Sequence, residues 1–366
     1  MKKYRLIALY LPQYHPIEEN NEWWGEGFTE WVNVASAKPL YKGHLQPNIP
    51  ADLGFYDLRL SESRIAQAEM AKRYGIEGFC YWHYWFGGNE RLLNKPFEEV
   101  LKSKTPNFPF CLAWANHSWY AKTWNNDSPD KLLKEQKYLG VDDYTKHFYE
   151  MLPAFKDERY ITVDGKLFFL IFSPLSSSEI KVFIKTWREL AKKNELNDFY
   201  FVGQGLKESQ SSILEMGFNA FQDNSLFSIY KNDNFIKKTI KKLAIHIFKR
   251  PAKIYDYSKA VDNMVSSNSK DINVIPCICP NWDHSPRSKE RALILKNSTP
   301  QNFKNHVMKV LRIIKDKPEE NRIAIIKSWN EWGEGNYLEP DLKYGKQYLE
   351  SLYDCIKYMN NDNTEI

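Results

Sequence analysis

The chain has 366 residues, 43% hydrophobic and 27% charged, which is the composition of a globular protein and not of a disordered one. Its net charge of +5 is small and spread along the sequence, which argues against a dedicated nucleic-acid binder. Aromatic residues make up 15%, with 12 Trp and 22 Tyr, and this excess over the needs of a core suggests carbohydrate binding, because sugar rings pack on aromatic side chains.

Short apolar runs rich in β-branched and aromatic residues alternate with helix-like stretches, which predicts repeated βα units. The eight predicted strands are residues 5–11, 76–82, 110–115, 167–172, 198–203, 218–222, 273–279 and 322–328. The predicted helices include residues 61–74, 142–155, 177–193, 301–315 and 344–358. Eight strands, with no glycine-rich phosphate loop after the first, favour an α/β fold of the (β/α)8 TIM-barrel type over an open sheet. We expect residues 1–366 to form a single catalytic domain.

The N-terminal residues are basic and then apolar, as in a signal peptide, but the apolar run ends at Pro12 and no small-residue cleavage site follows. No later run approaches the roughly 20 apolar residues that span a bilayer. Five cysteines, an odd number, indicate buried reduced thiols and not a disulfide framework. We therefore expect a cytoplasmic protein. Cys277 and Cys279 have no second Cys or His pair at metal-ligand spacing, so neither a metal nor a cofactor is expected.

The first predicted strand is followed by a long aromatic segment, residues 13–60, which contains the run WWGEGFTEW at residues 23–31. Connections of this length are usually functional or disordered, and this one is too aromatic to be disordered. We therefore expect the segment to form a wall of the substrate site.

Polar and aromatic side chains also crowd the carboxyl ends of the predicted strands, where a (β/α)8 barrel carries its active site. The predicted substrate-binding residues are Tyr14, His15, Trp23, Trp24, Glu30, Trp31, Trp82, His83, Trp114, Asn116, His117, Gln204, Asp223, Trp282, Asp283, Asn330 and Trp332. Either His83 or His117 could contact a sugar hydroxyl or phosphate, although a lone histidine is more often structural. Asp283 and Arg287 could form a local ion pair or hold a charged donor.

The segment after the last predicted strand carries two acids three positions apart, Glu331 and Glu334, in a turn that also holds Gly333 and Gly335. Glycosidic chemistry needs one carboxylic acid to protonate the departing oxygen and a second carboxylate as base or nucleophile. These two glutamates are the predicted catalytic residues. The alternative is that they cap the following turn or pair with a basic side chain. Glu339 could shape the same site or cap a helix.

A basic segment, residues 231–250, interleaves lysines with apolar residues. Such a helix can lie on an anionic membrane surface, where lipid-linked acceptors are found. The alternative, slightly favoured, is the solvated face of an ordinary barrel helix.

Several segments together carry a family resemblance. They are LYLPQYHP at residues 9–16, EWWG at 22–25, GFTEWVN at 27–33, GFCYWHYWF at 78–86, WANH at 114–117, WD at 282–283 with PR at 286–287, and SWNEWGEG at 328–335. The chain resembles, over nearly its whole length, the WbsX-type glycosyltransferase-like family of bacterial surface-polysaccharide gene clusters. That family is similar in turn to the endo-α-mannosidases of glycoside hydrolase family 99, which share the barrel and an Asn-Glu-Trp-x-Glu-Gly motif.

The resemblance implies a carbohydrate-active enzyme of O-antigen or capsule biosynthesis that transfers a glycosyl unit, with a nucleotide-sugar donor and a lipid-linked glycan acceptor as candidate partners. In the mannosidases, the first motif glutamate removes the proton of the sugar 2-hydroxyl and the second protonates the leaving group. By motif position, Glu331 would be the base and Glu334 the acid. The chain departs from the mannosidases at Gly333, where they commonly have His.

Two alternatives to glycosyl transfer follow. One is a retaining endo-α-glycosidase of the family 99 type, which would act through a 1,2-anhydro sugar. The other is a noncatalytic glycan-binding barrel, for which Gly333 in place of His is the support.

Overall fold

The computed structural model describes residues 4–121, 130–228, 251 and 253–361. Its central sheet is a ring of parallel strands in the order β12-β10-β9-β8-β4-β2-β1-β15-β13. These strands are β1 (Arg5–Tyr10), β2 (Gly78–Trp85), β4 (Phe110–Trp114), β8 (Lys166–Ile171), β9 (Phe199–Gly205), β10 (Ala220–Asp223), β12 (Val274–Ile275), β13 (Cys277–Ile278) and β15 (Ile323–Ile326).

The two ends of the sheet meet at residues 274–278. The predicted strand at residues 273–279 is divided at Pro276 into β12, which pairs with β10, and β13, which pairs with β15. The Ile325 amide donates to the Pro276 carbonyl at 3.1 Å, so the backbone bonding continues across the break. Proline has no N–H to give to a ladder, which explains the interruption. The eight predicted strands are therefore confirmed as a nearly closed α/β barrel.

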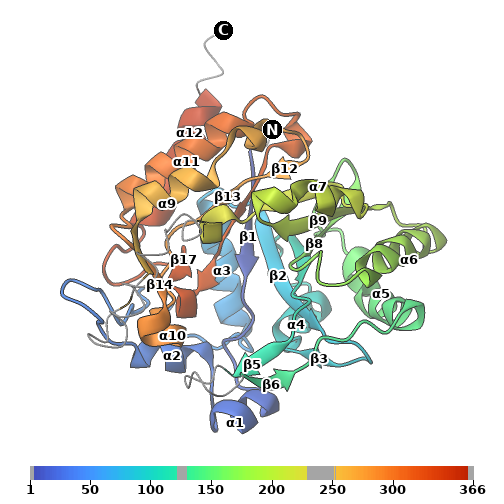
Figure 1. The fold of residues 1–366 in the computed structure, drawn as a ribbon, viewed down its shortest axis with the longest axis horizontal. Coiled ribbons are helices and arrows are strands. Elements are labelled where there is room, and N and C mark those ends of the chain that lie inside the picture. Colours follow the sequence, from blue (N-terminus) through green and yellow to red (C-terminus); the bar gives the residue numbers. More distant parts are fainter. Residues whose placement is uncertain (1–3, 122–129, 229–250, 252, 362–366) are drawn as a thin grey trace.

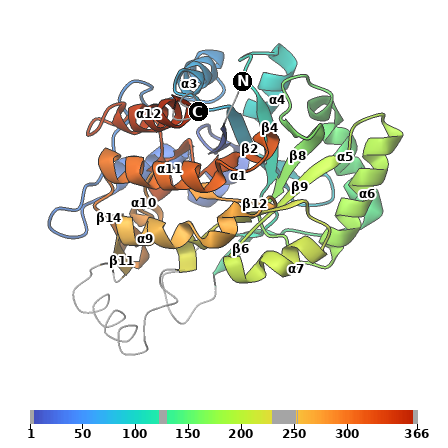
Figure 2. The ribbon, with the colours of Figure 1, turned by 90° about the horizontal axis from the view of Figure 1, so that it is seen from above.

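A helix follows each strand of the ring except β12, which continues directly into β13, and together these helices surround the strands (Figure 2). They are α3 (Ser61–Arg73), α4 (Lys95–Ser103), α5 (Val141–Phe155), α6 (Glu179–Lys193), α7 (Gln210–Glu215), α9 (Tyr257–Met264), α11 (Pro300–Ile314) and α12 (Gln347–Asn361). Because helices cover the outside and side chains fill the inside, the strands are buried on both faces, which accounts for their continuous apolar sequences. The five predicted helices are confirmed, with ends that differ by up to three residues.

The core between the helices and the barrel is strongly aromatic. Trp187 of α6 is at its centre, with Phe148 of α5 and Phe183 of α6 packed on it at ring-centroid distances of 5.8 and 4.4 Å. Trp187 in turn packs on Phe169 of β8 and Phe199 of β9, at 4.8 and 5.3 Å. Each such ring contributes about 1.5–3 kcal/mol by burial alone. All five cysteines are buried and free.

Short strands and helices lie at the ends of the barrel (Figure 1). The shorter strands are β3 (Arg91–Leu92), β5 (Trp119–Ala121), β6 (Lys131–Lys134), β7 (Thr162–Val163), β11 (Lys253–Asp256), β14 (Leu293–Lys296), β16 (Asn330–Glu331) and β17 (Asn336–Tyr337). The short helices are α1 (Glu18–Trp24), α2 (Glu30–Ser36) and α10 (Ser285–Ser288), with 3-10 turns at Lys207–Ser209, Ser225–Ser228, Ser267–Lys270, Lys289–Arg291, Glu319–Asn321 and Trp332–Glu334.

The long segment of residues 13–60 contains the two helices α1 and α2. The Thr29 side chain caps α2 by accepting a hydrogen bond from the Trp31 amide at 3.3 Å. The basic segment 231–250 lies outside the described residues. Within the described ranges, no helix combines the length and the apolar character needed to cross a membrane.

Candidate active site

The two predicted catalytic glutamates lie beyond the carboxyl end of β15, in a hairpin formed by β16, a 3-10 turn at Trp332–Glu334, and β17. Asn330 ties this hairpin to the end of β1: its side chain accepts from the Leu11 amide at 2.8 Å and donates to the Leu11 carbonyl at 3.0 Å. The Tyr14 hydroxyl donates to the Asn330 carbonyl and accepts from the Trp332 amide. Residues from both ends of the chain therefore fix the position of the glutamates.

Trp332 and Glu339 form the second anchor of the hairpin. The Trp332 indole stacks on Tyr337 with ring centroids 3.7 Å apart, and its N–H donates to the Glu339 carboxylate at 2.6 Å. The same carboxylate accepts from the Tyr56 hydroxyl at 2.8 Å and from the Gln67 amide at 2.6 Å. Burial raises the pKa of Glu339 to about 7. Glu339 therefore shapes the site from behind and does not cap a helix.

Arg287 of α10 joins three carboxylates. Its Nη1 lies 2.7 Å from Oε1 of Glu334 and 3.4 Å from Oε1 of Glu331, while its Nε donates to Oε2 of Glu30 at 3.0 Å. His284 adds a weaker contact, with Nε2 3.4 Å from Oε1 of Glu334. We call Arg287, Glu30, Glu331 and Glu334 the acid–arginine cluster. Because both motif carboxylates contact one guanidinium nitrogen, they lie within a few ångströms of each other.

The environment makes the two motif glutamates unequal. Burial, reinforced by the charge of Glu334, raises the pKa of Glu331 to about 7, although Arg287 and Lys327 act in the opposite direction. Burial would also raise the pKa of Glu334, but Arg287 and His284 outweigh it and lower this pKa to about 2. Near neutral pH, Glu334 is therefore ionised while Glu331 can hold a proton. This order is the reverse of the one that the motif-based roles of base and acid require.

Gly333 lies where the cluster needs space. A Cβ at this position would stand 2.1 Å from Oε2 of Glu30 and 2.8 Å from Nε of Arg287. Any side chain there, an imidazole included, would collide with the Glu30–Arg287 ion pair. The space that Glu30 and Arg287 occupy therefore explains the glycine at position 333, without any loss of catalytic function.

Further groups surround the cluster. Lys327, at the end of β15, lies with its ammonium 5.2 Å from the centroid of the Trp282 ring, and its charge acts on both motif glutamates. Tyr84 of β2 is buried, and burial together with the charge of Glu331 raises its pKa. The pKa of His117 is lowered by burial and raised by Glu334, which places this imidazole within electrostatic reach of the cluster.

Several of the predicted substrate-binding residues are buried and hold the hairpin or the long segment in place; they do not present an exposed surface to a substrate. Tyr14, Trp31, Asn330 and Trp332 hold the hairpin, and the Trp31 indole donates to the Tyr56 carbonyl at 2.8 Å. Asp283 accepts from His44 at 2.8 Å and from Gln46 at 2.7 Å. Asp283 is therefore held by the 13–60 segment and forms no local pair with Arg287.

Other predicted residues face the helices or stabilise loops. His83 lies against His147 of α5, with their Nε2 atoms 2.7 Å apart, and burial lowers the pKa of His83 to about 3. The Trp114 indole donates to the Trp85 carbonyl, and Asn116 bonds the backbone of Ser173. His15 is 1% exposed, and burial lowers its pKa to about 4.

The remaining predicted residues lie at the barrel mouth or on the long segment. Gln204 of β9 is buried, and its side-chain amide has no hydrogen-bond partner within the described residues. Since buried amides are normally paired, this one can bind a ligand or a water molecule. Asp223, one strand away, accepts from the Ser225 amide. Trp82 packs on Phe172. Trp23 packs on Trp119, while Trp24 is 48% exposed and packs on Phe28.

The prediction missed three groups that the structure brings to the glutamates: Arg287 as their common partner, Lys327 and Tyr84. A charged residue at the end of an apolar strand was the available signal for Lys327, and adjacency to the predicted residue Asp283 was the signal for Arg287. Within the described ranges, no cluster of three or more His, Cys, Asp or Glu side chains is arranged to hold a metal ion.

Comparison with known sequences gives one family. A family model described as "Glycosyltransferase WbsX" matches residues 6–352. Two proteins named "Uncharacterized protein WxcX", from strains B100 and ATCC 33913 of Xanthomonas campestris pv. campestris, are each 30% identical over 368 residues. The alignments cover 99% of this chain and 51% of each relative, so the chain spans about half the length of the curated relatives it matches.

Comparison with solved structures gives the same barrel. The GH99 endo-α-mannosidase from Bacteroides thetaiotaomicron, in complex with bis-tris propane, superposes with a TM-score of 0.57 at 13% identity and 99% coverage of both chains. A glycoside hydrolase-like protein gives a TM-score of 0.56 at 14% identity, covering 97% of this chain and 94% of the other. These likenesses establish the fold.

Proposed function

Because the chain belongs to the WbsX glycosyltransferase family, we propose that it transfers a glycosyl unit in the assembly of a bacterial surface polysaccharide, with Glu331 and Glu334 as its catalytic residues. Membership in this family and the barrel fold both indicate an enzyme that acts on glycans. The observation that carries the proposal is the unequal environment of two adjacent carboxyl groups. Arg287 and His284 lower the pKa of Glu334, whereas burial and the charge of Glu334 raise the pKa of Glu331.

We propose that Glu331 is the acid and Glu334 the base. Glu334 would remove the proton of the sugar 2-hydroxyl as O2 attacks C1, and Glu331 would give its proton to the oxygen that leaves C1, which yields a 1,2-anhydro sugar. An acceptor hydroxyl would then attack C1 while Glu331 takes its proton, and O2 would recover a proton from Glu334. Two displacements at C1 retain the anomeric configuration.

A second candidate is a retaining endo-α-glycosidase, which the likeness of the fold to the GH99 endo-α-mannosidase favours. The two candidates share the first displacement and differ in whether an acceptor or water attacks C1. The noncatalytic alternative loses its support, because the space at Gly333 is needed by Glu30 and Arg287.

For the transferase, we propose a nucleotide-sugar donor and a lipid-linked glycan acceptor, which would place the reaction on the cytoplasmic side of the membrane. In this proposal the aromatic segment 13–60 forms a wall of the substrate site, with Trp23 and the half-exposed Trp24 as aromatic contacts and Gln204 and His117 as polar contacts.

The test is incubation of the purified protein with a panel of nucleotide sugars and, separately, with α-linked oligosaccharides. Transfer of sugar with release of nucleotide supports the transferase, and new reducing ends support the hydrolase. Glu331→Gln and Glu334→Gln should each remove turnover by at least about a hundredfold while thermal unfolding stays cooperative. Turnover at the wild-type rate in either variant would refute the site assignment.

A further inference from the structure

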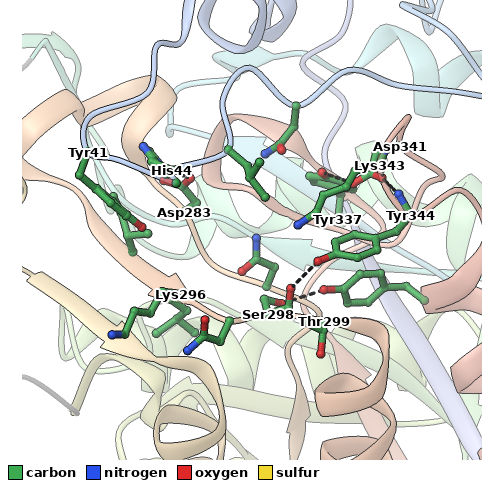
Figure 3. Close-up of a pocket in the computed structure, with 18 of the residues that line it drawn as sticks. Tyr41, His44, Asp283, Lys296, Ser298, Thr299, Tyr337, Asp341, Lys343 and Tyr344 are labelled. Carbon is green, nitrogen blue, oxygen red and sulfur yellow. Dashed lines mark hydrogen bonds and ion pairs between the residues drawn. The ribbon is translucent and has the colours of Figure 1, made fainter.

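A pocket lies beside the acid–arginine cluster and is lined by none of the four residues of that cluster. Its cavity volume is about 390 Å³, and its lining comes from residues 41–45 and 48, Asn281, Asp283, residues 294–299, and part of the segment 337–348 (Figure 3). Ligand pockets in proteins span roughly 300–1,000 Å³, so this one suits a small ligand such as a monosaccharide unit.

The pocket walls combine aromatic rings with hydroxyl and amide groups. Tyr41 and Tyr344 lie on opposite sides of the cavity in Figure 3, with Ser298 below Tyr344. The Tyr344 hydroxyl donates to the Ser298 carbonyl at 3.4 Å, and the Ser298 hydroxyl lies 2.9 Å from that of Tyr348. Side-chain amides of Asn281 and Asn297 complete this lining. Aromatic faces beside fixed hydroxyl and amide groups match the alternation of C–H and O–H surface on a sugar ring.

The acidic side chains that line the pocket are already engaged. Asp283 accepts from His44 and Gln46, and Glu339 is held by the hydrogen bonds behind the hairpin. Asp341 accepts from the Tyr337 hydroxyl at 2.8 Å and from two backbone amides. The oxygens of these carboxylates are thus occupied by donors other than the lysines of the pocket.

Three lysines line the same cavity, Lys42, Lys296 and Lys343. In the part of the chain that the structure describes, none of the three forms an ion pair with a carboxylate, and Lys343 instead lies with its ammonium 4.0 Å from the centroid of the Tyr344 ring. The pocket thus presents three lysine ammonium groups that its own carboxylates do not hold, one of them beside an aromatic face, and this arrangement favours an anion attached to a ring.

We propose that this pocket binds a sugar unit that carries a negative charge, as a carboxylate or a phosphate. The sugar ring packs between the tyrosines, and its anionic group contacts Lys296 and Lys343. Two residues that line the pocket contact the catalytic hairpin: the Asp283 amide donates to the Glu334 carbonyl at 2.7 Å, and Tyr337 stacks on Trp332. It is a binding site of its own, which stands or falls independently of the roles of Glu331 and Glu334.

The experiment is calorimetric titration of the full chain with glucuronic acid and glucose 1-phosphate, with glucose as the neutral counterpart and inorganic phosphate as the anion alone. At least one of the acidic sugars should bind at least about tenfold more tightly than glucose and more tightly than inorganic phosphate. A carboxylate and a phosphate source are distinguished by which of the two binds more tightly.

The variants assign the binding to this pocket. Lys296→Ala with Lys343→Ala should remove the preference for acidic over neutral sugars, while Lys185→Ala, an exposed lysine of α6 outside the pocket, should leave it intact. Glu331→Gln should also keep it, whether or not this variant has lost turnover. Binding of both acidic sugars no tighter than that of glucose, no binding at all, or an unchanged preference in the double variant would each overturn the proposal. Loss of the preference in Glu331→Gln would also overturn it, because the binding would then belong to the catalytic region.

Discussion

Nη1 of Arg287 lies 2.7 Å from Oε1 of Glu334, and this contact makes the two glutamates of the motif chemically unequal. The same nitrogen is 3.4 Å from Glu331, too far for a strong charge-assisted hydrogen bond. One carboxylate therefore takes most of the positive charge, and the other, buried beside it, takes a proton more readily.

The first prediction assigns the acid. An α-glycosyl fluoride needs little protonation to lose its leaving group, so the first displacement should survive in a variant without the acid but not in a variant without the base. We expect Glu331→Gln to keep at least about a tenth of the wild-type rate of fluoride release in the first turnover, because Glu331 acts as a base only in the second displacement, and to lose turnover on substrates with poor leaving groups. Glu334→Gln should lose both, as measured by fluoride release. Fluoride turnover that survives in Glu334→Gln but not in Glu331→Gln would restore the motif-based roles.

The second prediction concerns pH. Since Glu331 must hold its proton to act as the acid, kcat/KM should fall as the pH rises through about 7. The fall should be weaker with the fluoride, which does not need the proton. The measurement is the pH profile of kcat/KM for both kinds of substrate. A kcat/KM that instead rises with pH through about 7 would mean that Glu331 acts as the base.

A third prediction separates Arg287 from the glutamates. Without the guanidinium, the pKa of Glu334 should rise, because burial is then less opposed. In Arg287→Gln, the loss of activity at low pH should therefore move to higher pH, and the rate should fall at least about tenfold at neutral pH. Lys289→Gln, in the 3-10 turn after α10, is the matched control and should leave the profile unchanged. An unshifted acidic limb in Arg287→Gln would remove Arg287 from this positioning role.

Much of the barrel could be predicted, because strands buried on both faces have continuous apolar sequences that differ from amphipathic helices. The direction in which each side chain of the site points could not be predicted in the same way. His83 and Tyr84 are neighbours at the end of β2, and strand geometry sends them to opposite sides. His83 meets His147 of α5, whereas Tyr84 lies within the field of Glu331. The sequence alone does not state which of two adjacent residues faces the barrel mouth.

Much of the aromatic content belongs to the core and not to a binding surface. Trp85, Trp114, Trp187, Trp329 and Trp332 are all less than 2% exposed and pack in the core or behind the hairpin. Only part of the aromatic excess is therefore available to a sugar. The cluster itself joins residues from positions 30, 287, 331 and 334, and such long-range pairing follows from closure of the barrel and not from any local pattern.

The fourth prediction tests the space at Gly333. Gly333→Ala should lower the free energy of unfolding by about 1–3 kcal/mol, because the new Cβ collides first with Glu30. In a Glu30→Ala background the same substitution should cost less, since the nearest colliding atom has gone. The two single variants and the double variant form a cycle, measured by urea unfolding. Strict additivity would show that Glu30 does not occupy this space in solution.

The last prediction concerns Glu339, which holds Trp332 in place. In Glu339→Gln one carboxylate oxygen becomes an amide that faces the donors now bonded there, so the free energy of unfolding should fall by about 1–3 kcal/mol at pH 7.5. Because the folded pKa of Glu339 is about 7, above its ordinary value, its proton stabilises the fold fully below pH ~4.5 and this contribution is lost as the pH rises through about 7.

The stability of the wild type should therefore decline between pH 5 and 8 more steeply than that of Glu339→Gln, as urea unfolding across this range would measure. Glu331 titrates in the same window, so part of the slope should remain in the variant. Glu320→Gln, whose side chain is 54% exposed and pairs with Arg5, is the control and should change stability by less than about 1 kcal/mol. A Glu339→Gln protein as stable as the wild type, with the same pH slope, would show that the Trp332 anchor does not depend on this carboxylate.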